Sequence, residues 1–184
     1  MRVYIERPTA KREEEFLRAI RRSRALHRNW VQPPDHPAAY QHYLKVLRRD
    51  NQEGFFVCEA ESGSLAGVVD IDDIVRGALQ SASLGYYALA PYAGQGLLRE
   101  GLGLVIHHCF RDLKLHRLEA NIQPQNRRSI ALVGSLGFRL EGVSPRFMKI
   151  GGRWRDHQRW AILADEWRPG RLDARPALAS RSLG

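Results

Sequence analysis

Residues 83–98 read Ser-Leu-Gly-Tyr-Tyr-Ala-Leu-Ala-Pro-Tyr-Ala-Gly-Gln-Gly-Leu-Leu and change character half-way. The first half, as far as Leu89, is rich in aromatic and apolar residues and predicts a strand. The second half contains Gly94 and Gly96 and opens a long helix, from Leu97 to about Leu113, in which apolar residues recur at helical spacing. The stretch therefore predicts a strand, a glycine-rich turn and a long helix in direct succession.

The glycine-rich turn is placed where an anion can bind. Glycine accepts positive φ angles and lets a ligand approach the backbone closely. The first turn of a helix carries unpaired N–H groups and the positive end of the helix dipole, which together suit a diphosphate. The expected donors are the backbone amides of Gly94, Gln95, Gly96, Leu97 and Leu98. The turn is neither a P-loop nor a complete dinucleotide fingerprint, so on its own it is also compatible with a plain connector.

The remaining pattern predicts a mixed chain of helices and strands. Strands are expected over residues 3–5, 54–60, 65–71 and 116–123, helices over 11–28, 38–49 and 127–136, and a closing hairpin over 138–150 and 153–163. In the first helix we expect Phe16, Leu17, Ile20 and Ala25 to form the apolar stripe. The strand before the turn and the strand after the long helix form a β–α–β unit, which favours a parallel pair.

Length and composition indicate how many domains the chain forms and where it works. The 184 residues carry a formal charge of +9, and residues 1–167 are expected to form one domain, followed by a disordered basic tail over 168–184. No stretch is long and apolar enough for a membrane span, and no signal peptide is visible. Two isolated cysteines, Cys58 and Cys109, predict reduced core thiols. We therefore expect a cytoplasmic protein with no membrane partner.

Several segments around the turn resemble one enzyme superfamily. They are Leu84–Tyr87 before the turn, His116–Asn121 after the long helix, Pro124–Ser129, Leu136–Gly142, Val75–Gly77, Ile150–His157 and Trp167–Arg171. Their order and spacing resemble the GNAT acetyltransferases, and within them the bacterial RimJ-type ribosomal-protein-alanine N-acetyltransferases. The resemblance covers about residues 54–171 and, more loosely, the N-terminal helices.

The resemblance implies an α+β fold in three layers, α/β/α, around a mixed, mostly antiparallel sheet of about seven strands that splays between its two central parallel strands. It also implies acetyl-CoA as co-substrate and no metal. Two residues depart from the family's turn: Ala93 stands where Gln or Arg is usual, and Leu98 stands where a small residue is usual. Neither departure removes the main-chain amides.

The same resemblance implies roles for individual residues. Tyr87, Ala88 and Leu89 would bind the pantetheine arm along the strand edge. Asn126 would contact the cofactor, and Ser129 would donate a hydrogen bond to the departing thiolate. Asn126 is also a candidate helix N-cap. The two roles are compatible, because capping uses the side-chain oxygen and leaves the amide NH2 free. Glu119 is a candidate general base, with Asp70, Asp72 and Asp73 as alternatives.

The resemblance implies direct attack of a primary amine on the acetyl group in a ternary complex. The expected acceptor is the N-terminal α-amine of a protein, possibly a ribosomal protein or the ribosome, with Arg21, Arg22 and Arg24 available for docking. A small amine, such as an antibiotic, polyamine or amino acid, is the alternative. A basic nucleic-acid-binding module without catalysis is a third reading, but aromatic residues are not interleaved with the basic ones as in single-strand binders. We expect no specific DNA partner, and either a monomer or a homodimer.

Overall fold

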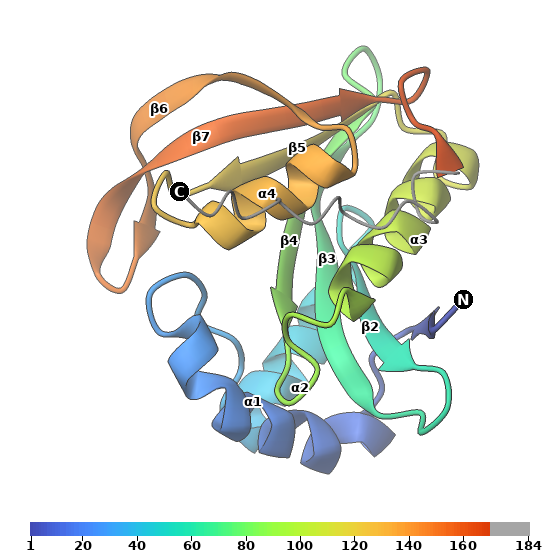
Figure 1. Cartoon of the computed structure of the whole chain (residues 1–184), viewed down its shortest axis with the longest axis vertical. Coiled ribbons are helices and arrows are strands. Elements are labelled where there is room, and N and C mark those ends of the chain that lie inside the picture. The colour runs from blue at the N-terminus through green and yellow to red at the C-terminus, as the bar shows by residue number, and fades with distance from the viewer. Residues whose placement is uncertain (170–184) are drawn as a thin grey trace, which may run out of the picture.

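A single seven-stranded sheet organises the chain, in the order β1-β2-β3-β4-β5-β7-β6. The computed structural model describes residues 1–169, and Figure 1 shows helices on both faces of the sheet. The strands are β1 (Val3–Glu6), β2 (Glu53–Glu59), β3 (Leu65–Val75), β4 (Ser81–Ala88), β5 (Arg117–Ile122), β6 (Arg139–Ile150) and β7 (Arg153–Leu163). The helices are the 3-10 helix η1 (Ala10–Arg12), α1 (Glu13–His27), α2 (Pro37–Val46), α3 (Leu97–Arg111) and α4 (Arg127–Ser135).

The sheet is mixed, as expected. Only β4 and β5 run parallel, because α3 carries the chain back between them, and every other neighbouring pair is antiparallel. The three-layer α/β/α fold and the β–α–β unit predicted from residues 83–123 are confirmed. Most of the predicted tail, from residue 170 on, lies outside the described residues.

Some boundaries differ from those expected. The second helix begins at Pro37, where the His36 side chain accepts a hydrogen bond from the Ala39 N–H, and it ends at Val46 rather than at residue 49. Strand β3 continues past Ile71 to Val75, across an irregularity in its pairing with β4. In α1 the prediction for Ala25 was wrong: Ala25 is exposed, and Ser23 and His27 are buried in the stripe instead.

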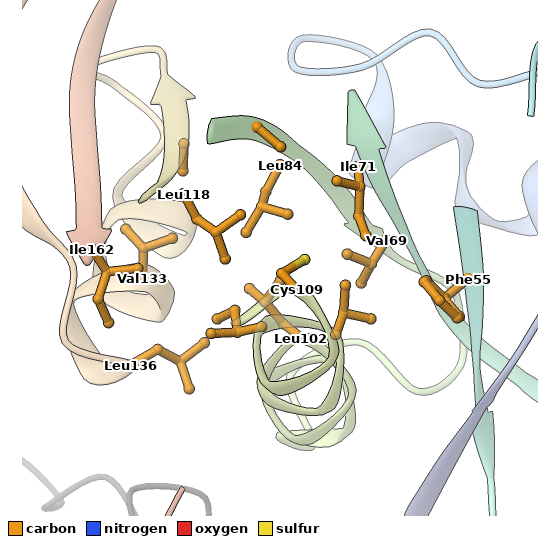
Figure 2. Close-up of a cluster of buried hydrophobic side chains, with 14 of the residues drawn as sticks. Phe55, Val69, Ile71, Leu84, Leu102, Cys109, Leu118, Val133, Leu136 and Ile162 are labelled. Atoms are coloured by element: carbon orange, nitrogen blue, oxygen red, sulfur yellow. The ribbon is translucent and has the colours of Figure 1, made fainter. Parts of the chain in front are cut away.

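Two apolar cores lie on opposite faces of the sheet, because side chains alternate along each strand. Phe56 of β2 and Val68 of β3 face α1 and α2, where they meet Phe16, Ile20 and Tyr40. Their sequence neighbours Phe55 and Val69 face α3 and belong to the larger core, which also takes in residues of α4 such as Val133. Figure 2 shows this larger core gathered around Leu102 and Cys109 of α3.

Close contact between α3 and β2 depends on a glycine. A Cβ added at Gly101 would lie 2.3 Å from a methyl group of Val57, well inside van der Waals contact. Val57 is fully buried between α3 and the rest of the sheet, so it has no free space to move into. The missing side chain at Gly101 therefore sets how closely α3 approaches the sheet.

We predict that Gly101→Ala destabilises the protein by about 1–3 kcal/mol, because overpacking forces the helix away from β2. The matched control is Gly134→Ala in α4, where an added Cβ meets nothing within 4 Å. That change replaces a glycine in the last turn of α4 and should stabilise by up to about 0.5 kcal/mol. Urea unfolding of both variants measures the difference, and equal effects of the two changes would contradict this account of the packing.

Candidate functional site

The two parallel strands part soon after they meet. Strand β4 pairs with β5 only from Ser81 opposite Arg117 to Ser83 opposite Glu119, although β4 continues to Ala88 and β5 to Ile122. Figure 1 shows the two strands diverging beyond this point. The later part of β4 therefore has one edge that is paired with β3 and one edge that no strand within residues 1–169 covers.

The direction of each backbone group on β4 follows from two hydrogen bonds. The Gln80 carbonyl accepts from the His116 N–H at 2.7 Å, towards β5, and the Leu89 N–H donates to the Ala66 carbonyl at 2.9 Å, towards β3. Because groups alternate along a strand, the even-numbered residues of β4 face β5. Beyond the last pair, the backbone groups of Tyr86 and Ala88 therefore face the uncovered edge.

This alternation sorts the residues that we expected at the edge. Ala88 faces the uncovered side. Tyr87 pairs with Val68 on β3, and the Leu89 N–H is bonded to β3, so the backbones of these two residues point away from it. Tyr86, which the sequence did not single out, presents its backbone to the uncovered side instead.

The glycine-rich turn has the geometry expected of an anion site. Gly94 and Gly96 have φ angles of +83° and +84°, and Gly96 is the N-cap of α3. The Gln95 N–H is used within the turn, on the Tyr92 carbonyl, and the Glu100 N–H bonds the Gly96 carbonyl. The N–H groups of Leu97 and Leu98, at the start of α3, precede the first intrahelical bond, which the Glu100 N–H makes.

The structure shows how the turn accommodates its two unusual residues, Ala93 and Leu98. The Leu98 side chain lies over Gly67 of β3, where an added Cβ would be 2.8 Å from Leu98 Cδ1, so it does not obstruct the amides. The Ala93 position has no long polar side chain, but Arg2 reaches the same turn. Its guanidinium donates to the Gln95 carbonyl at 3.1 Å and forms an ion pair with Glu100. Sequence reasoning missed Arg2, because it is far from the turn along the chain.

Helix α4 brings a hydroxyl pair under the uncovered edge. Asn126 is the N-cap, and its Oδ1 accepts from the Ser129 N–H at 3.2 Å. The Ser129 hydroxyl is 2.7 Å from the hydroxyl of Tyr86, which is on the same face of the sheet as α4. Burial raises the pKa of Tyr86 far above neutrality, so its hydroxyl keeps its proton. The structure thus brings Ser129 and Asn126 together and adds Tyr86 to them.

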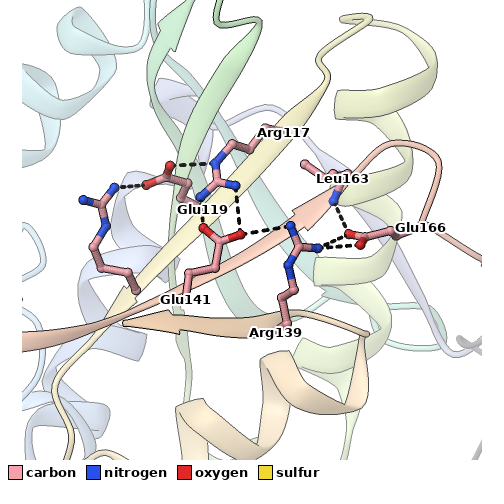
Figure 3. Close-up of polar contacts among 7 residues, drawn as sticks. Arg117, Glu119, Arg139, Glu141, Leu163 and Glu166 are labelled. Atoms are coloured by element: carbon pink, nitrogen blue, oxygen red, sulfur yellow. Dashed lines mark hydrogen bonds and ion pairs between the residues drawn. The ribbon is translucent and has the colours of Figure 1, made fainter. Parts of the chain in front are cut away.

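Glu119 is held by two arginines. Its carboxylate accepts from Arg117 Nε at 2.8 Å and from Arg159 at 2.9 Å, and Arg117 is paired further with Glu141 (Figure 3). Burial pushes the pKa of Glu119 upward, but the bonds from the two arginines outweigh it and leave the pKa below its usual value. A carboxylate in this state is a weak proton acceptor, which argues against Glu119 as the general base.

Two other carboxyl groups lie on the α1/α2 face beside the edge. Asp70 accepts a hydrogen bond from the Tyr43 hydroxyl of α2 at 2.6 Å. Asp72 lies over Gly85 of β4, with Oδ2 3.4 Å from the place where a Cβ would be. Burial, with the charge of Asp72, raises the pKa of Asp70 to about 7, and burial, with the charge of Asp73, raises that of Asp72 to about 6.

An unsatisfied oxygen lies on the β5 side of the same region. The Asn121 side chain donates to the Ser83 hydroxyl at 3.4 Å, while its Oδ1 is buried and has no hydrogen-bond partner among the described residues. Asn121 faces the same side of the sheet as Glu119, two residues earlier on β5. This face therefore offers acceptors for a group that carries several N–H donors.

Within residues 1–169 no group of three or more His, Cys, Asp or Glu side chains could hold a metal ion. In the same part of the chain no helix is long and apolar enough to cross a bilayer.

Comparison with known proteins agrees with this geometry. The family model described as an acetyltransferase (GNAT) domain matches residues 2–139. The chain belongs to the GNAT acetyltransferases. It is therefore an N-acetyltransferase, and the fold, with its parted parallel strands and glycine turn, is that of the family.

Individual GNAT relatives differ in substrate. The chain is 32% identical over 140 residues to the [ribosomal protein uS5]-alanine N-acetyltransferase of Escherichia coli, an alignment that covers 74% of this chain and 72% of the relative. It is 24% identical over 183 residues to the spermidine N(1)-acetyltransferase of E. coli, covering 92% and 94%. Among solved structures, Mycobacterium smegmatis RimJ in complex with CoA-disulfide has a TM-score of 0.83 at 26% identity, covering 93% of this chain and 88% of that one.

We predict that Gly94→Trp abolishes measurable acetyl-CoA binding, because the indole fills the space in front of the α3 amides. Gly94→Ala is the matched control: both variants carry the same strain at a positive φ, but an added Cβ meets nothing within 4 Å. The alanine variant should keep most of the affinity measured by calorimetry. Unchanged affinity in the tryptophan variant would show that the diphosphate binds elsewhere.

Proposed function

We propose that this GNAT enzyme transfers the acetyl group of acetyl-CoA to the N-terminal α-amine of a protein, by direct attack in a ternary complex. The observation that carries this proposal is the uncovered edge of β4, which leads from the hydroxyl pair at Ser129 to the amides of α3. Support for the acceptor class comes from the 32% identity to a ribosomal-protein-alanine acetyltransferase.

The cofactor would bind along backbone groups. Its diphosphate would accept from the amides of Gly94, Gly96, Leu97 and Leu98, since the Gln95 N–H is already bonded within the turn, and Arg2 would contribute positive charge nearby. Its amide-containing arm would add to the β4 edge as an extra strand adds to a sheet, at Tyr86 and Ala88. Tyr87 and Leu89 pack their side chains into the core beneath α1 and α2, so they would support the edge rather than contact the arm. The amide NH2 of Asn126 would reach the arm from α4.

The edge can also stabilise the reacting carbonyl. A backbone N–H that faces the uncovered side and is already held in strand geometry can donate to the oxygen on which negative charge develops. Tyr86 provides such a group next to Gly85, on the side where Asp72 lies. The amine can therefore approach the thioester carbonyl from the α1/α2 face while the sulfur leaves towards α4.

Ser129 and Tyr86 would assist the leaving thiolate. Tyr86 stays protonated, so it can donate its hydrogen to the Ser129 oxygen and leave the Ser129 proton free to point at the sulfur. The attack forms an amide bond between the amine nitrogen and the acetyl carbon, and it breaks the carbon–sulfur bond. The proton lost by the amine passes to the general base, and the departing thiolate accepts a hydrogen bond from the Ser129 hydroxyl.

We predict that Ser129→Ala lowers kcat by about a hundredfold with a smaller change in KM for acetyl-CoA, because the hydroxyl acts on charge that develops in the transition state. Tyr86→Phe should lower kcat less than Ser129→Ala does. The loss of kcat in the double variant should not exceed the product of the two single losses, because the two hydroxyls act as a pair. Steady-state kinetics by thiol release measures this. Equal losses in affinity and kcat would point to a packing role for Ser129 instead.

Asp72 is our candidate for the general base. Among residues 1–169 no hydrogen-bond donor holds its carboxylate ionised. It overlies Gly85 beside the reacting position, and its pKa of about 6 lies close enough to neutrality for a base. Asp70 lies two residues earlier and shares the same face. The buried Oδ1 of Asn121 would accept from the incoming amine.

We predict that Asp72→Asn lowers kcat/KM by about a hundredfold or more, whereas Asp73→Asn, an exposed neighbour, leaves it nearly unchanged. Folding raises the pKa of Asp72, so its ionised form costs stability above the unfolded value of about 3.9. The asparagine variant should therefore be at least as stable as wild type at pH 8 by urea unfolding. A stable variant with normal kcat/KM would remove Asp72 from the mechanism.

The acceptor is best identified by comparing the rates of acetyl transfer to different classes of amine. We expect acetyl-CoA-dependent thiol release with peptides that begin with Ala or Ser, and little with spermidine or aminoglycosides. The exposed Arg21, Arg22 and Arg24 of α1 favour a large acidic partner over a polycation. A polyamine is the second candidate, since Asp70 and Asp72 lie near the edge and spermidine acetyltransferases are among the relatives. Faster turnover of spermidine than of peptides would reverse this order.

We place the reaction in the cytoplasm, where ribosomal proteins are made. Cys58 and Cys109 are both buried and unpaired, which fits a reducing compartment.

A further inference from the structure

Helix α1 bonds the far end of the uncovered β4 edge through two buried side chains. His27 Nε2 is 2.8 Å from the Ala88 carbonyl oxygen. The Ser23 hydroxyl accepts from the Ala90 N–H at 2.9 Å and donates to the Ala19 carbonyl at 2.7 Å. Ser23 is fully buried and His27 is 5% exposed, so neither bond is exchanged readily for water.

The partner of His27 determines its protonation. A carbonyl oxygen only accepts, so Nε2 must carry the hydrogen. The other ring nitrogen, Nδ1, is buried without a partner among the described residues, and protonating it would bury an unpaired N–H. Burial also lowers the pKa of His27, which favours the neutral ring. His27 is thus a neutral side chain whose donor is directed at the β4 edge.

These bonds limit the part of β4 that remains free. Pairing with β5 stops at Ser83 opposite Glu119. At the other end, α1 occupies the Ala88 carbonyl and the Ala90 N–H. Between these limits, the Tyr86 N–H and carbonyl and the Ala88 N–H face the uncovered side. The free edge is therefore short and is held at both of its ends.

We propose that His27 is a positioning residue for the cofactor arm: its bond to the Ala88 carbonyl holds the end of β4 in strand geometry where β5 no longer supports it. This rests on the proposed function, since it assigns the edge to acetyl-CoA. A binding edge that is fixed before the ligand arrives needs no ordering on binding. The bond also links α1, on the acceptor side, to the strand that carries the cofactor.

Two substitutions at His27 distinguish the contribution of its N–H donor from that of its aromatic ring. His27→Phe keeps an aromatic ring for the edge-to-face contact with Tyr87, whose centroid is 5.1 Å away, but removes the donor. His27→Gln keeps an N–H donor. The control is Ile20→Val, a buried change in the same helix whose side chain cannot hydrogen-bond in either form.

The experiment compares two ligands by calorimetry: acetyl-CoA, which has the arm, and ADP, which has only the diphosphate part. We expect His27→Phe to weaken acetyl-CoA binding about tenfold, because an edge without this donor must be ordered when the arm binds, and to leave ADP binding unchanged. His27→Gln should recover most of the loss, and Ile20→Val should change neither affinity.

The inference is overturned if His27→Phe binds acetyl-CoA as wild type does, if acetyl-CoA and ADP weaken equally, or if His27→Gln is no better than His27→Phe. Failure of the wild-type protein to bind acetyl-CoA is a different result. It would contradict the proposed function itself, and the inference about His27 with it.

Discussion

The parting of β4 from β5 after three residue pairs is the constraint around which the rest of the molecule is arranged. Backbone N–H and carbonyl groups need partners when they are withdrawn from water. A strand in the middle of a sheet that loses its neighbour on one side must find those partners elsewhere. Here α1 provides them at one end of the exposed edge, and the intervening groups are left for a ligand of strand-like shape.

Side chains alternate along β4, so the groups proposed to act on the amine and on the leaving thiolate lie on opposite faces of the sheet. Tyr86 directs its side chain towards α4 and Ser129, on the side assigned to the leaving group. Gly85, the residue before it, has no side chain and leaves room on the opposite face, next to Asp72 and Asp70. The backbone between the two faces is the edge itself. One short strand can thus hold a thioester with its two reaction partners on opposite sides.

Much of this arrangement could be predicted from the sequence, because the signals are local. Gly94 and Gly96 mark the turn, the spacing of apolar residues marks α3, and Asn126 followed by Ser129 marks the start of α4. Features that depend on distant segments could not be predicted. Arg2 reaches the turn through the pairing of β1 with β2, and Glu119 is neutralised by Arg159 from β7. Ser23 and His27 are polar residues within a helix whose burial depends on where β4 ends.

The most direct test of the account is hydrogen exchange at individual backbone amides of β4, with and without bound CoA. Exchange at the amides of Tyr86 and Ala88 should slow markedly when CoA binds, because each N–H gains an acceptor, while Leu89, already bonded to Ala66, should change little. If CoA binds and the amides of Tyr86 and Ala88 exchange at the same rate as in the free protein, the β4 edge is not the cofactor site.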